Sequence, residues 1–362
     1  IPYKQTVIPY LDSVSDIARR IGAVNTIVNK KGKLYGYNTD FFGMSELARH
    51  AGISFDEKKV LILGTGGTSK TAYAVAKHYG AREIVRASRD GKEGAILYAE
   101  VYKSHTDSEI IINTTPVGMF PKTQGSPIDL SSFGSLVGVL DAVYNPLYTN
   151  LVLNAKSKGI KATGGLYMLV MQAVVAVEKF LDIEISKTVA DKVYESVFLS
   201  KENIVLTGMP GSGKSTIGKI IDIEGFSFVD TDDEIAKRCG CSVKELIDKK
   251  GEKYFRDLET EVIKDISSKG CQIISTGGGA VLRQENVNYL KQNGKLYFID
   301  ANPDRLIPTD NRPLSDTVEK LQKLYADRIG IYNETADVVV CDMSTPAKEA
   351  EFILKRRSEL IM

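Results

Sequence analysis

Short apolar runs alternate with segments of helical periodicity along this chain of 362 residues. In the first half, runs of strand length fall at residues 60–63, 83–85, 110–113, 137–140 and 160–162. Residues 69–78 contain no proline and place Ala72, Val75 and Ala76 at helical spacing. Regular alternation of strands with helices predicts a parallel sheet covered by helices.

The second half repeats this alternation, with strand-length runs at residues 204–206, 226–229, 273–275, 295–299 and 338–340. A second doubly wound parallel sheet is therefore expected. Residues 190–198 have the pattern of a closing helix, and residues 199–203 form a short polar joint without proline or glycine. The boundary between two domains of ordinary size is placed near Ser200.

The composition is typical of a globular protein with almost no net charge. Hydrophobic residues make up 43% of the chain and charged residues 26%, and 47 basic side chains balance 46 acidic ones. Because the net charge is close to zero, the protein has no strong positive electrostatic field to attract polyanions, and nucleic acid is not an expected partner. The longest apolar stretch, residues 168–177, is about half a membrane span and contains Gln172, so it predicts a buried helix and no membrane segment.

The cysteine pattern favours reduced thiols in a cytoplasmic protein. Cys239, Cys241, Cys271 and Cys341 form no CxxC pair and lie far in the sequence from the 3 histidines, so a structural zinc site is not expected. The chain opens on residues 1–4 without methionine or a charged and then apolar leader, which suggests a fragment whose upstream portion is absent. The oligomeric state stays open.

A glycine-rich loop at residues 64–69 follows the first apolar run and precedes the first predicted helix. This order is typical of a dinucleotide site, in which Gly64, Gly66 and Gly67 cradle the pyrophosphate. Arg89 follows the second predicted strand, where the ribose 2′ position lies, and an arginine there favours NADP. The neighbouring Asp90 offers a carboxylate to a ribose hydroxyl, so NAD stays an alternative.

A second loop at residues 208–215 fits the GxxxxGK[ST] pattern of nucleoside-triphosphate sites. Backbone amides of such a loop surround the β-phosphate, Lys214 reaches the β and γ oxygens, and Ser215 binds Mg²⁺. A plain glycine turn with an exposed lysine is the alternative. The sequence thus predicts ATP and Mg²⁺, with a nucleotide site made of Gly211, Ser212, Gly213, Lys214, Ser215 and Thr216.

Two acidic residues follow the next predicted strand. Asp230 and Asp232 stand at positions i and i+2 at the strand end, so their side chains are expected to share one face beside the phosphate loop. One carboxylate would then hold the metal through water while the other meets an alcohol. A solvated acidic loop before a helix is the alternative.

From about residue 203 to 355 the chain resembles shikimate kinase. Beyond the phosphate loop, the family's motifs occur in order as Asp230-Thr231-Asp232, Phe255-Arg256-Asp257-Leu258-Glu259, Ser275-Thr276-Gly277-Gly278-Gly279, Arg312-Pro313-Leu314, and Arg328 four residues before Tyr332.

The resemblance implies a role for each of these positions. Asp230 takes the Mg²⁺ role, and Asp232 binds the shikimate hydroxyls and accepts a proton from the attacking one. Arg256, Gly278 and Arg328 bind the substrate. The two arginines can make paired charge-assisted hydrogen bonds to its carboxylate, and Gly278 allows the ring to approach the backbone closely. Arg312 is the lid arginine that folds over the transferred phosphate, in a lid that is shorter and less basic than the family's usual one.

Residues 1–199 resemble shikimate dehydrogenase. The resemblance is carried by six ordered motifs: Ile1-Pro2-Tyr3-Lys4, Gly22-Ala23-Val24-Asn25-Thr26, Gly36-Tyr37-Asn38-Thr39-Asp40, Asn113-Thr114-Thr115-Pro116-Val117-Gly118-Met119, Tyr144-Asn145-Pro146-Leu147-Tyr148-Thr149, and Gly165-Leu166-Tyr167-Met168-Leu169 through Gln172.

This second resemblance implies that Lys4 supplies the proton at the ketone oxygen and that Asp40 sets the orientation and charge of Lys4. Asn25, Tyr144 and Gln172 match substrate-contacting positions, and the amide of Gln172 in an apolar helix calls for partners. Without the family, Lys4 reads as a solvated lysine and Asp40 as a helix cap before Phe41. The family's serine pair for the substrate carboxylate has no counterpart here.

The predicted fold is therefore α/β throughout. It comprises a Rossmann-type NADP-binding domain at residues 44–164 with part of an α/β substrate domain at 1–43 and 165–199, followed by a P-loop kinase domain with a parallel sheet at 200–362.

The two resemblances together imply a bifunctional enzyme of aromatic amino acid biosynthesis, acting only on small molecules. The front half would reduce 3-dehydroshikimate to shikimate with NADPH, and the back half would phosphorylate shikimate to shikimate 3-phosphate with ATP. Two alternatives are a monofunctional kinase with a vestigial NADP-binding front half and a non-enzymatic nucleotide sensor. Quinate stays an alternative substrate of the front half.

Overall fold

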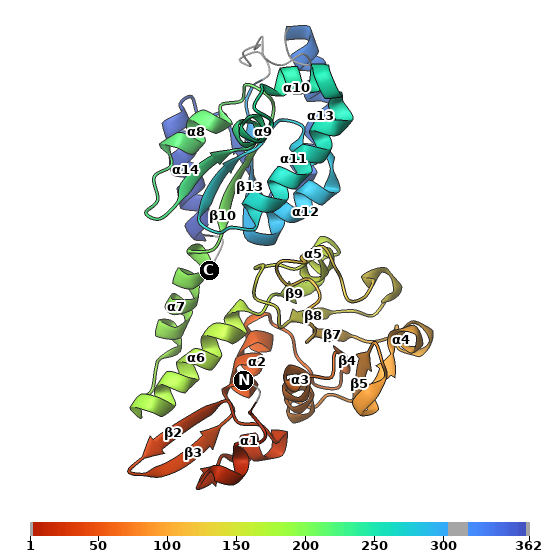
Figure 1. Ribbon diagram of the computed structural model, residues 1–362, viewed down its shortest axis with the longest axis vertical. Helices are drawn as coiled ribbons and strands as arrows, with labels where there is room; N and C mark the ends of the chain where they lie inside the picture. Colours follow the sequence, from red (N-terminus) through yellow and green to blue (C-terminus); the bar gives the residue numbers. More distant parts are fainter. Residues whose placement is uncertain (1–2, 303–317, 360–362) are drawn as a thin grey trace. The chain divides into compact units, whose positions relative to one another are not determined.

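The computed structural model describes residues 3–302 and 318–359 and divides into two compact units, Ile1–Phe198 and Leu199–Met362 (Figure 1). Each unit contains its own parallel sheet. The predicted lid, with Arg312, lies outside the described residues.

The main sheet of the front unit has six parallel strands in the order β6-β5-β4-β7-β8-β9. Their bounds are β4 (Lys59–Leu63), β5 (Glu83–Ser88), β6 (Ile96–Leu97), β7 (Ile110–Asn113), β8 (Gly138–Asp141) and β9 (Lys161–Thr163). Leu61 pairs with both Val85 and Ile111, so β4 lies at the point where the strand order reverses. Ligands of open parallel sheets bind at the carboxyl ends of such strands.

Helices cover both faces of this sheet. Alternate residues of β4 point to opposite sides, with Val60 and Ile62 in one hydrophobic cluster and Leu61 and Leu63 in another. The covering elements are α3 (Gly67–His78), α4 (Tyr98–Ser104) and α5 (Asn150–Ser157), joined by the short η2 (Lys92–Gly94) and η3 (Leu130–Ser132). The predicted parallel α/β fold is confirmed.

A small sheet, in the order β1-β3-β2, precedes the main one and was not predicted. It consists of β1 (Ser13–Val14), β2 (Thr26–Lys30) and β3 (Lys33–Tyr37), with η1 (Ile8–Tyr10), α1 (Asp16–Ile21) and α2 (Thr39–His50) beside it. Helix α2 packs against α6 (Leu166–Leu181) at Gly43, where an added Cβ would lie 2.6 Å from the carbonyl oxygen of Met168. The absence of a side chain at Gly43 therefore allows the two helices to approach closely.

Helix α6 is buried over only its first half, so the prediction of a buried helix at residues 168–177 is partly wrong. Met168 and Met171 are buried, whereas the side chain of Val177 is 40% exposed. The reason is that the front hydrophobic core extends along α6 only to Val174. No helix within the described ranges 3–302 and 318–359 is long and apolar enough to cross a membrane.

Helix α7 (Lys187–Leu199) ends the front unit. The back unit has a five-stranded parallel sheet in the order β11-β12-β10-β13-β14. Its strands are β10 (Asn203–Thr207), β11 (Ser227–Asp230), β12 (Gln272–Ser275), β13 (Gly294–Asp300) and β14 (Val338–Cys341). The covering elements are α8 (Lys214–Ile220), α9 (Thr231–Cys239), α10 (Val243–Lys250), α11 (Glu252–Ser267), η4 (Ala280–Leu282), α12 (Gln284–Asn293), α13 (Val318–Thr335) and α14 (Pro346–Glu359).

This second sheet is also covered on both faces. Ile217 of α8 and Ile353 of α14 pack on one side, and Ile263 of α11 and Leu290 of α12 pack on the other. Because β10, β11 and β12 are adjacent and parallel, the loops that follow them meet at one edge of the sheet. These loops carry the phosphate-loop, paired-aspartate and triple-glycine motifs.

Candidate active sites

An ion pair in the front unit joins Lys4 to Asp40. The ammonium Nζ of Lys4 donates to Oδ2 of Asp40 at 2.7 Å, and Nδ2 of Asn25 donates to Oδ1 of the same carboxylate at 2.9 Å. Both carboxylate oxygens are thus engaged. The side chain of Lys4 stays 33% exposed, so the ammonium is held in one orientation and is still accessible to a ligand.

Neighbouring backbone contacts fix these three side chains. The carbonyl of Lys4 accepts from the amide of Val24 at 2.8 Å, and Oδ1 of Asn25 accepts from the amide of Thr39 at 2.9 Å. Asn38 caps α2 by accepting from the amide of Phe41. The alternative reading of Asp40 as the cap is wrong, because Asn38 takes that place and leaves Asp40 in the first helical turn, facing Lys4.

Gln172 and Tyr144 are less tightly tied to this cluster. Gln172 is half-buried on α6, and its Cβ would lie 3.2 Å from a Cβ added at Gly43, one turn after Asp40 on α2. The Cβ of Gln172 therefore lies beside α2, and its amide is not the fully buried group that the apolar helix suggested. Tyr144 follows β8 and is 45% exposed.

The dinucleotide loop has one glycine that the fold requires and two that it does not. Gly64 has φ +113°, and an added Cβ would lie 2.7 Å from Oγ1 of Thr114. A Cβ on Gly66 or Gly67 would meet no atom of the chain within 4 Å. These two glycines border open space at the N-terminus of α3, where unpaired amides suit a pyrophosphate.

In the turn after β5, the carboxylate of Asp90 contacts neighbouring side chains. It pairs with Nζ of Lys92 at 3.1 Å and accepts from Oγ of Ser88 at 3.1 Å. The bond to Lys92, followed by that to Ser88, lowers the pKa of Asp90. Arg89 is exposed beside this turn, which favours a site for the 2′-phosphate of NADP over a ribose-binding carboxylate.

In the back unit, Lys214 lies folded against its own phosphate loop. Its Nζ donates to the carbonyl oxygens of Met209 at 2.7 Å and Gly208 at 3.0 Å, and its side chain is buried. The loop needs its glycines: Gly208 has φ +139°, and an added Cβ would lie 2.7 Å from the carbonyl oxygen of Ile299. The lysine is thereby held at the first residue of α8, against the carbonyl oxygens of the loop.

Oxygen donors gather beside this loop. Oγ of Ser215 donates to Oδ2 of Asp230 at 2.7 Å and lies 3.1 Å from Oγ of Ser275. Among the residues that the structure describes, no three His, Cys, Asp or Glu side chains are arranged to hold a metal. A hydroxyl with one carboxylate suits Mg²⁺ that takes its remaining ligands from phosphate and water.

The expectation that Asp230 and Asp232 share a strand face is wrong. β11 ends at Asp230, and Asp232 lies in the first turn of α9, where its backbone amide donates to Oδ1 of Asp230 at 3.0 Å. The chain turns between the two residues, so strand alternation does not apply. An added Cβ on Gly277 would lie 2.7 Å from Oδ1 of Asp232, which places that carboxylate against the triple-glycine loop.

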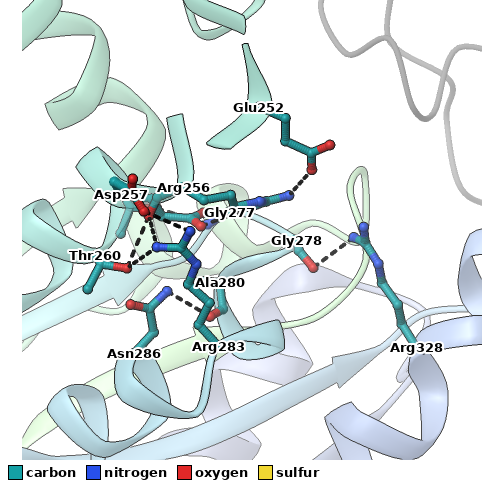
Figure 2. A network of polar contacts seen from close by, with 12 residues as sticks. Glu252, Arg256, Asp257, Thr260, Gly277, Gly278, Ala280, Arg283, Asn286 and Arg328 are labelled. Atoms are coloured by element: carbon teal, nitrogen blue, oxygen red, sulfur yellow. Dashed lines mark hydrogen bonds and ion pairs between the residues drawn. The ribbon is translucent and has the colours of Figure 1, made fainter. Parts of the chain in front are cut away.

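Figure 2 shows the two arginines that flank this glycine loop. Nη1 of Arg328 donates to the carbonyl oxygen of Gly278 at 3.1 Å, and the guanidinium of Arg256 lies directly against Gly279. An added Cβ on Gly278 would lie 2.7 Å from Cδ of Pro210 in the phosphate loop. The substrate residues predicted for this half therefore converge next to the nucleotide loop.

Glu259 belongs to this site and was not assigned a role from the sequence. Its Oε2 accepts from Nη1 of Arg256 at 2.8 Å, while its Oε1, on the side of Gly277, has no hydrogen-bond partner among residues 3–302 and 318–359. Burial raises the pKa of Glu259, and the charge of Arg256 opposes that rise. The spacing of three residues on one helix was the available signal, because it places both side chains on one face.

Known proteins match both units. The shikimate kinase family model matches residues 210–357, and the model of the shikimate dehydrogenase substrate binding domain matches residues 1–27. The NADP(+) shikimate dehydrogenase of Clostridium perfringens is 36% identical over 207 residues, which are 54% of this chain and 76% of that protein. The one from Geobacillus kaustophilus is 39% identical over 194 residues, 50% of this chain and 70% of that protein.

The chain belongs to the shikimate dehydrogenase family. A crystal structure of a chorismate mutase/shikimate 5-dehydrogenase fusion protein from Clostridium acetobutylicum matches with a TM-score of 0.52 and 33% identity, over 54% of this chain and 74% of that one. The back unit is a shikimate kinase domain. The chain therefore combines a shikimate dehydrogenase unit and a shikimate kinase unit, as the two sets of motifs predicted.

The shikimate dehydrogenase unit brings Lys4, Asn25 and Asp40 together, and the shikimate kinase unit brings together Asp232 and Arg256 at the glycine loop. The family assigns NADP to the first unit and ATP to the second. Open space at Gly66 and Gly67 and the phosphate loop around Lys214 fit these two nucleotides.

Proposed function

We propose that this chain performs two consecutive reactions on one carbon skeleton, the NADPH-dependent reduction of 3-dehydroshikimate and the ATP-dependent phosphorylation of the resulting shikimate. The observation that carries the proposal is the presence of two assembled polar sites, Lys4 with Asp40 and Arg256 with Asp232, in units of these two families. The hydroxyl formed by the first reaction is then available to the second.

In the front site, Lys4 donates a proton to the ketone oxygen as the carbonyl carbon is reduced, and Asp40 holds the Lys4 ammonium in one orientation. Gly64, Gly66, Gly67 and Arg89 would hold NADPH, which would supply the hydride when bound. Asn25 fixes the second oxygen of Asp40 and thereby its orientation. The amide of Gln172 and the hydroxyl of Tyr144 contact the substrate hydroxyls, for which their partial exposure leaves them available.

In the back site, Arg256 and Arg328 bind the substrate carboxylate while Gly278 allows the ring to approach the backbone. Asp232 accepts the proton of the attacking hydroxyl, and Lys214 turns from the loop carbonyls to the phosphate oxygens. The nucleotide lies along the backbone of residues 211–216. Ser215 and Asp230 would hold Mg²⁺, which neutralises phosphate charge when bound. The predicted role of Arg312 stays a prediction.

The proposal is favoured over a monofunctional kinase with a vestigial front half. Its support is the Lys4–Asp40 ion pair together with curated relatives that extend across the front unit. A nucleotide sensor without turnover would have no need of Asp232 and Arg256 around a glycine loop. Shikimate is preferred to quinate because the back unit is of a shikimate kinase family.

Separate assays on the purified chain test the two halves. We expect Lys4→Ala to lower the rate of NADP⁺ reduction with shikimate by about 10²-fold or more, as for loss of a general acid–base group, with kinase turnover within about twofold of wild type. Lys214→Ala should give the reverse pattern. Loss of both activities in either variant, or wild-type protein that turns over neither reaction, would contradict the proposal.

A further inference from the structure

Arg283 connects the glycine loop of the kinase site to the helix that carries Arg256. It follows η4, five residues after Gly278, and stands at the start of α12. Its guanidinium reaches back to α11, where Nη1 donates to the backbone carbonyl oxygen of Arg256 at 2.9 Å (Figure 2). The same nitrogen donates to Oγ1 of Thr260 at 3.2 Å, and Nη2 pairs with Asp257 at 2.9 Å.

In the part of the chain that the structure describes, the other polar contacts of Arg256 lie within its own helix. Its guanidinium pairs with Glu259 three residues later and with Glu252 four residues earlier. These contacts orient the guanidinium relative to α11, but they do not fix the position of α11 relative to the glycine loop. Apolar packing of Phe255 and Ile263 contributes to that position. The bonds from Arg283 add a polar connection, because they hold the Arg256 backbone to the segment that continues directly from the loop.

The position of α11 matters because the Arg256 guanidinium is closely packed against the glycine loop. The guanidinium of Arg256 lies against Gly279 with no room for a Cβ between them. A small slide of α11 would therefore move Arg256 away from the position at which it and Arg328 bind one carboxylate. Burial raises the pKa of Glu259, and the charges of Arg256 and, to a lesser extent, Arg283 oppose that rise.

We propose that Arg283 is a positioning residue of the kinase site: it holds the main chain of Arg256 so that the Arg256 guanidinium meets the substrate carboxylate. This inference rests on the proposed kinase function. Arg283 itself does not touch the substrate, so its removal should weaken shikimate binding without changing the use of ATP.

The chain offers a closely matched control. Arg238 of α9 pairs with Asp265, also on α11, at 2.9 Å, and the side chains of that pair are 34% and 57% exposed. The Arg283–Asp257 pair has the same distance and the same two exposures. Arg238→Ala therefore removes an equivalent ion pair from α11 without touching the backbone of Arg256.

The test compares steady-state kinase kinetics of Arg283→Ala, Arg283→Lys and Arg238→Ala, with calorimetric binding of shikimate and thermal unfolding of each. We expect Arg283→Ala to raise the KM for shikimate about tenfold, as for loss of a hydrogen bond from a charged donor. The kcat and the KM for ATP should change by less than about twofold. Arg283→Lys should recover part of the shikimate KM, and Arg238→Ala should leave it unchanged.

Equal shikimate KM values in Arg283→Ala and Arg238→Ala would overturn the inference, as would a KM for ATP that rises in step with that for shikimate. If Arg283→Ala does not fold, Arg283→Lys decides on the same two criteria. A wild-type chain that fails to phosphorylate shikimate refutes the proposed function itself. Wild-type turnover with an unresponsive shikimate KM refutes only the role of Arg283.

Discussion

Asp141, at the end of β8, is a fully buried carboxylate that ties together two loops of the front unit. It accepts hydrogen bonds from Nδ2 of Asn113 at 2.9 Å, from the amide of Val143 at 2.9 Å and from Oγ1 of Thr149 at 2.6 Å. These donors favour the ionised form, but burial outweighs them and raises the pKa of Asp141 to about 7 from an ordinary 3.8.

This shift predicts a pH dependence of stability. The folded protein holds the Asp141 proton more tightly than the unfolded chain, so the stabilisation is complete below about pH 4 and is lost as the pH rises to about 7. The loss amounts to as much as about 4 kcal/mol at about 1.4 kcal/mol per pH unit. Asp141→Asn keeps two acceptor contacts and places an amide against Thr149, so it should remove the dependence.

Urea unfolding of wild type and Asp141→Asn between pH 4 and 7 measures the difference. The free energy of unfolding of wild type should fall relative to that of the variant across this range. A difference between the two proteins that is constant with pH, or that grows in favour of wild type, would show that Asp141 is ionised in the folded protein throughout.

At the scale of elements, the start of α3 separates what the fold needs from what a cofactor needs. Gly64 has a left-handed backbone and no space for a Cβ, whereas Gly66 has φ −70° and faces open space. Glycine at the first position thus serves the chain, and glycine at the second is expected to serve the bound dinucleotide.

Substitution by alanine tests this division. Gly66→Ala should raise the Kd for NADPH at least about tenfold, because the new methyl group occupies the space of the pyrophosphate. The free energy of unfolding should stay within about 1 kcal/mol of wild type. Gly64→Ala should lower it by about 1–3 kcal/mol through its strained backbone. Calorimetric titration and urea unfolding measure the two quantities, and unchanged NADPH binding in Gly66→Ala would contradict the assignment.

Elements buried on both faces were predictable from the sequence. β4 and β10 are continuous apolar runs because helices cover them from both sides, and a glycine-rich loop follows each strand. The hairpin of β2 and β3 was not predicted, since it is short and partly exposed, and its apolar residues alternate only weakly with polar ones. Helix α6 misled because its apolar sequence continues beyond the core that buries its first half.

At the scale of the whole molecule, the motifs singled out polar side chains that the fold brings together, but they did not indicate every residue that supports them. Lys4 and Asp40 are 36 positions apart and meet only through the fold. Glu259 and Arg283 were not predicted for a similar reason. Glutamate and arginine are common on protein surfaces, and only the fold shows that Glu259 is buried and that Arg283 contacts the backbone of Arg256. The sequence therefore indicated the two families and their motifs better than it indicated the contacts that support those motifs.

In the proposed function, one chain reduces a ketone and then phosphorylates the same molecule. The most direct measurement supplies purified chain with 3-dehydroshikimate, NADPH, ATP and Mg²⁺ and identifies products by mass spectrometry while NADPH absorbance is followed. We predict shikimate 3-phosphate, with one NADPH and one ATP consumed for each molecule formed. Product limited to unphosphorylated shikimate, or 3-dehydroshikimate left unreduced while added shikimate is phosphorylated, would contradict the claim.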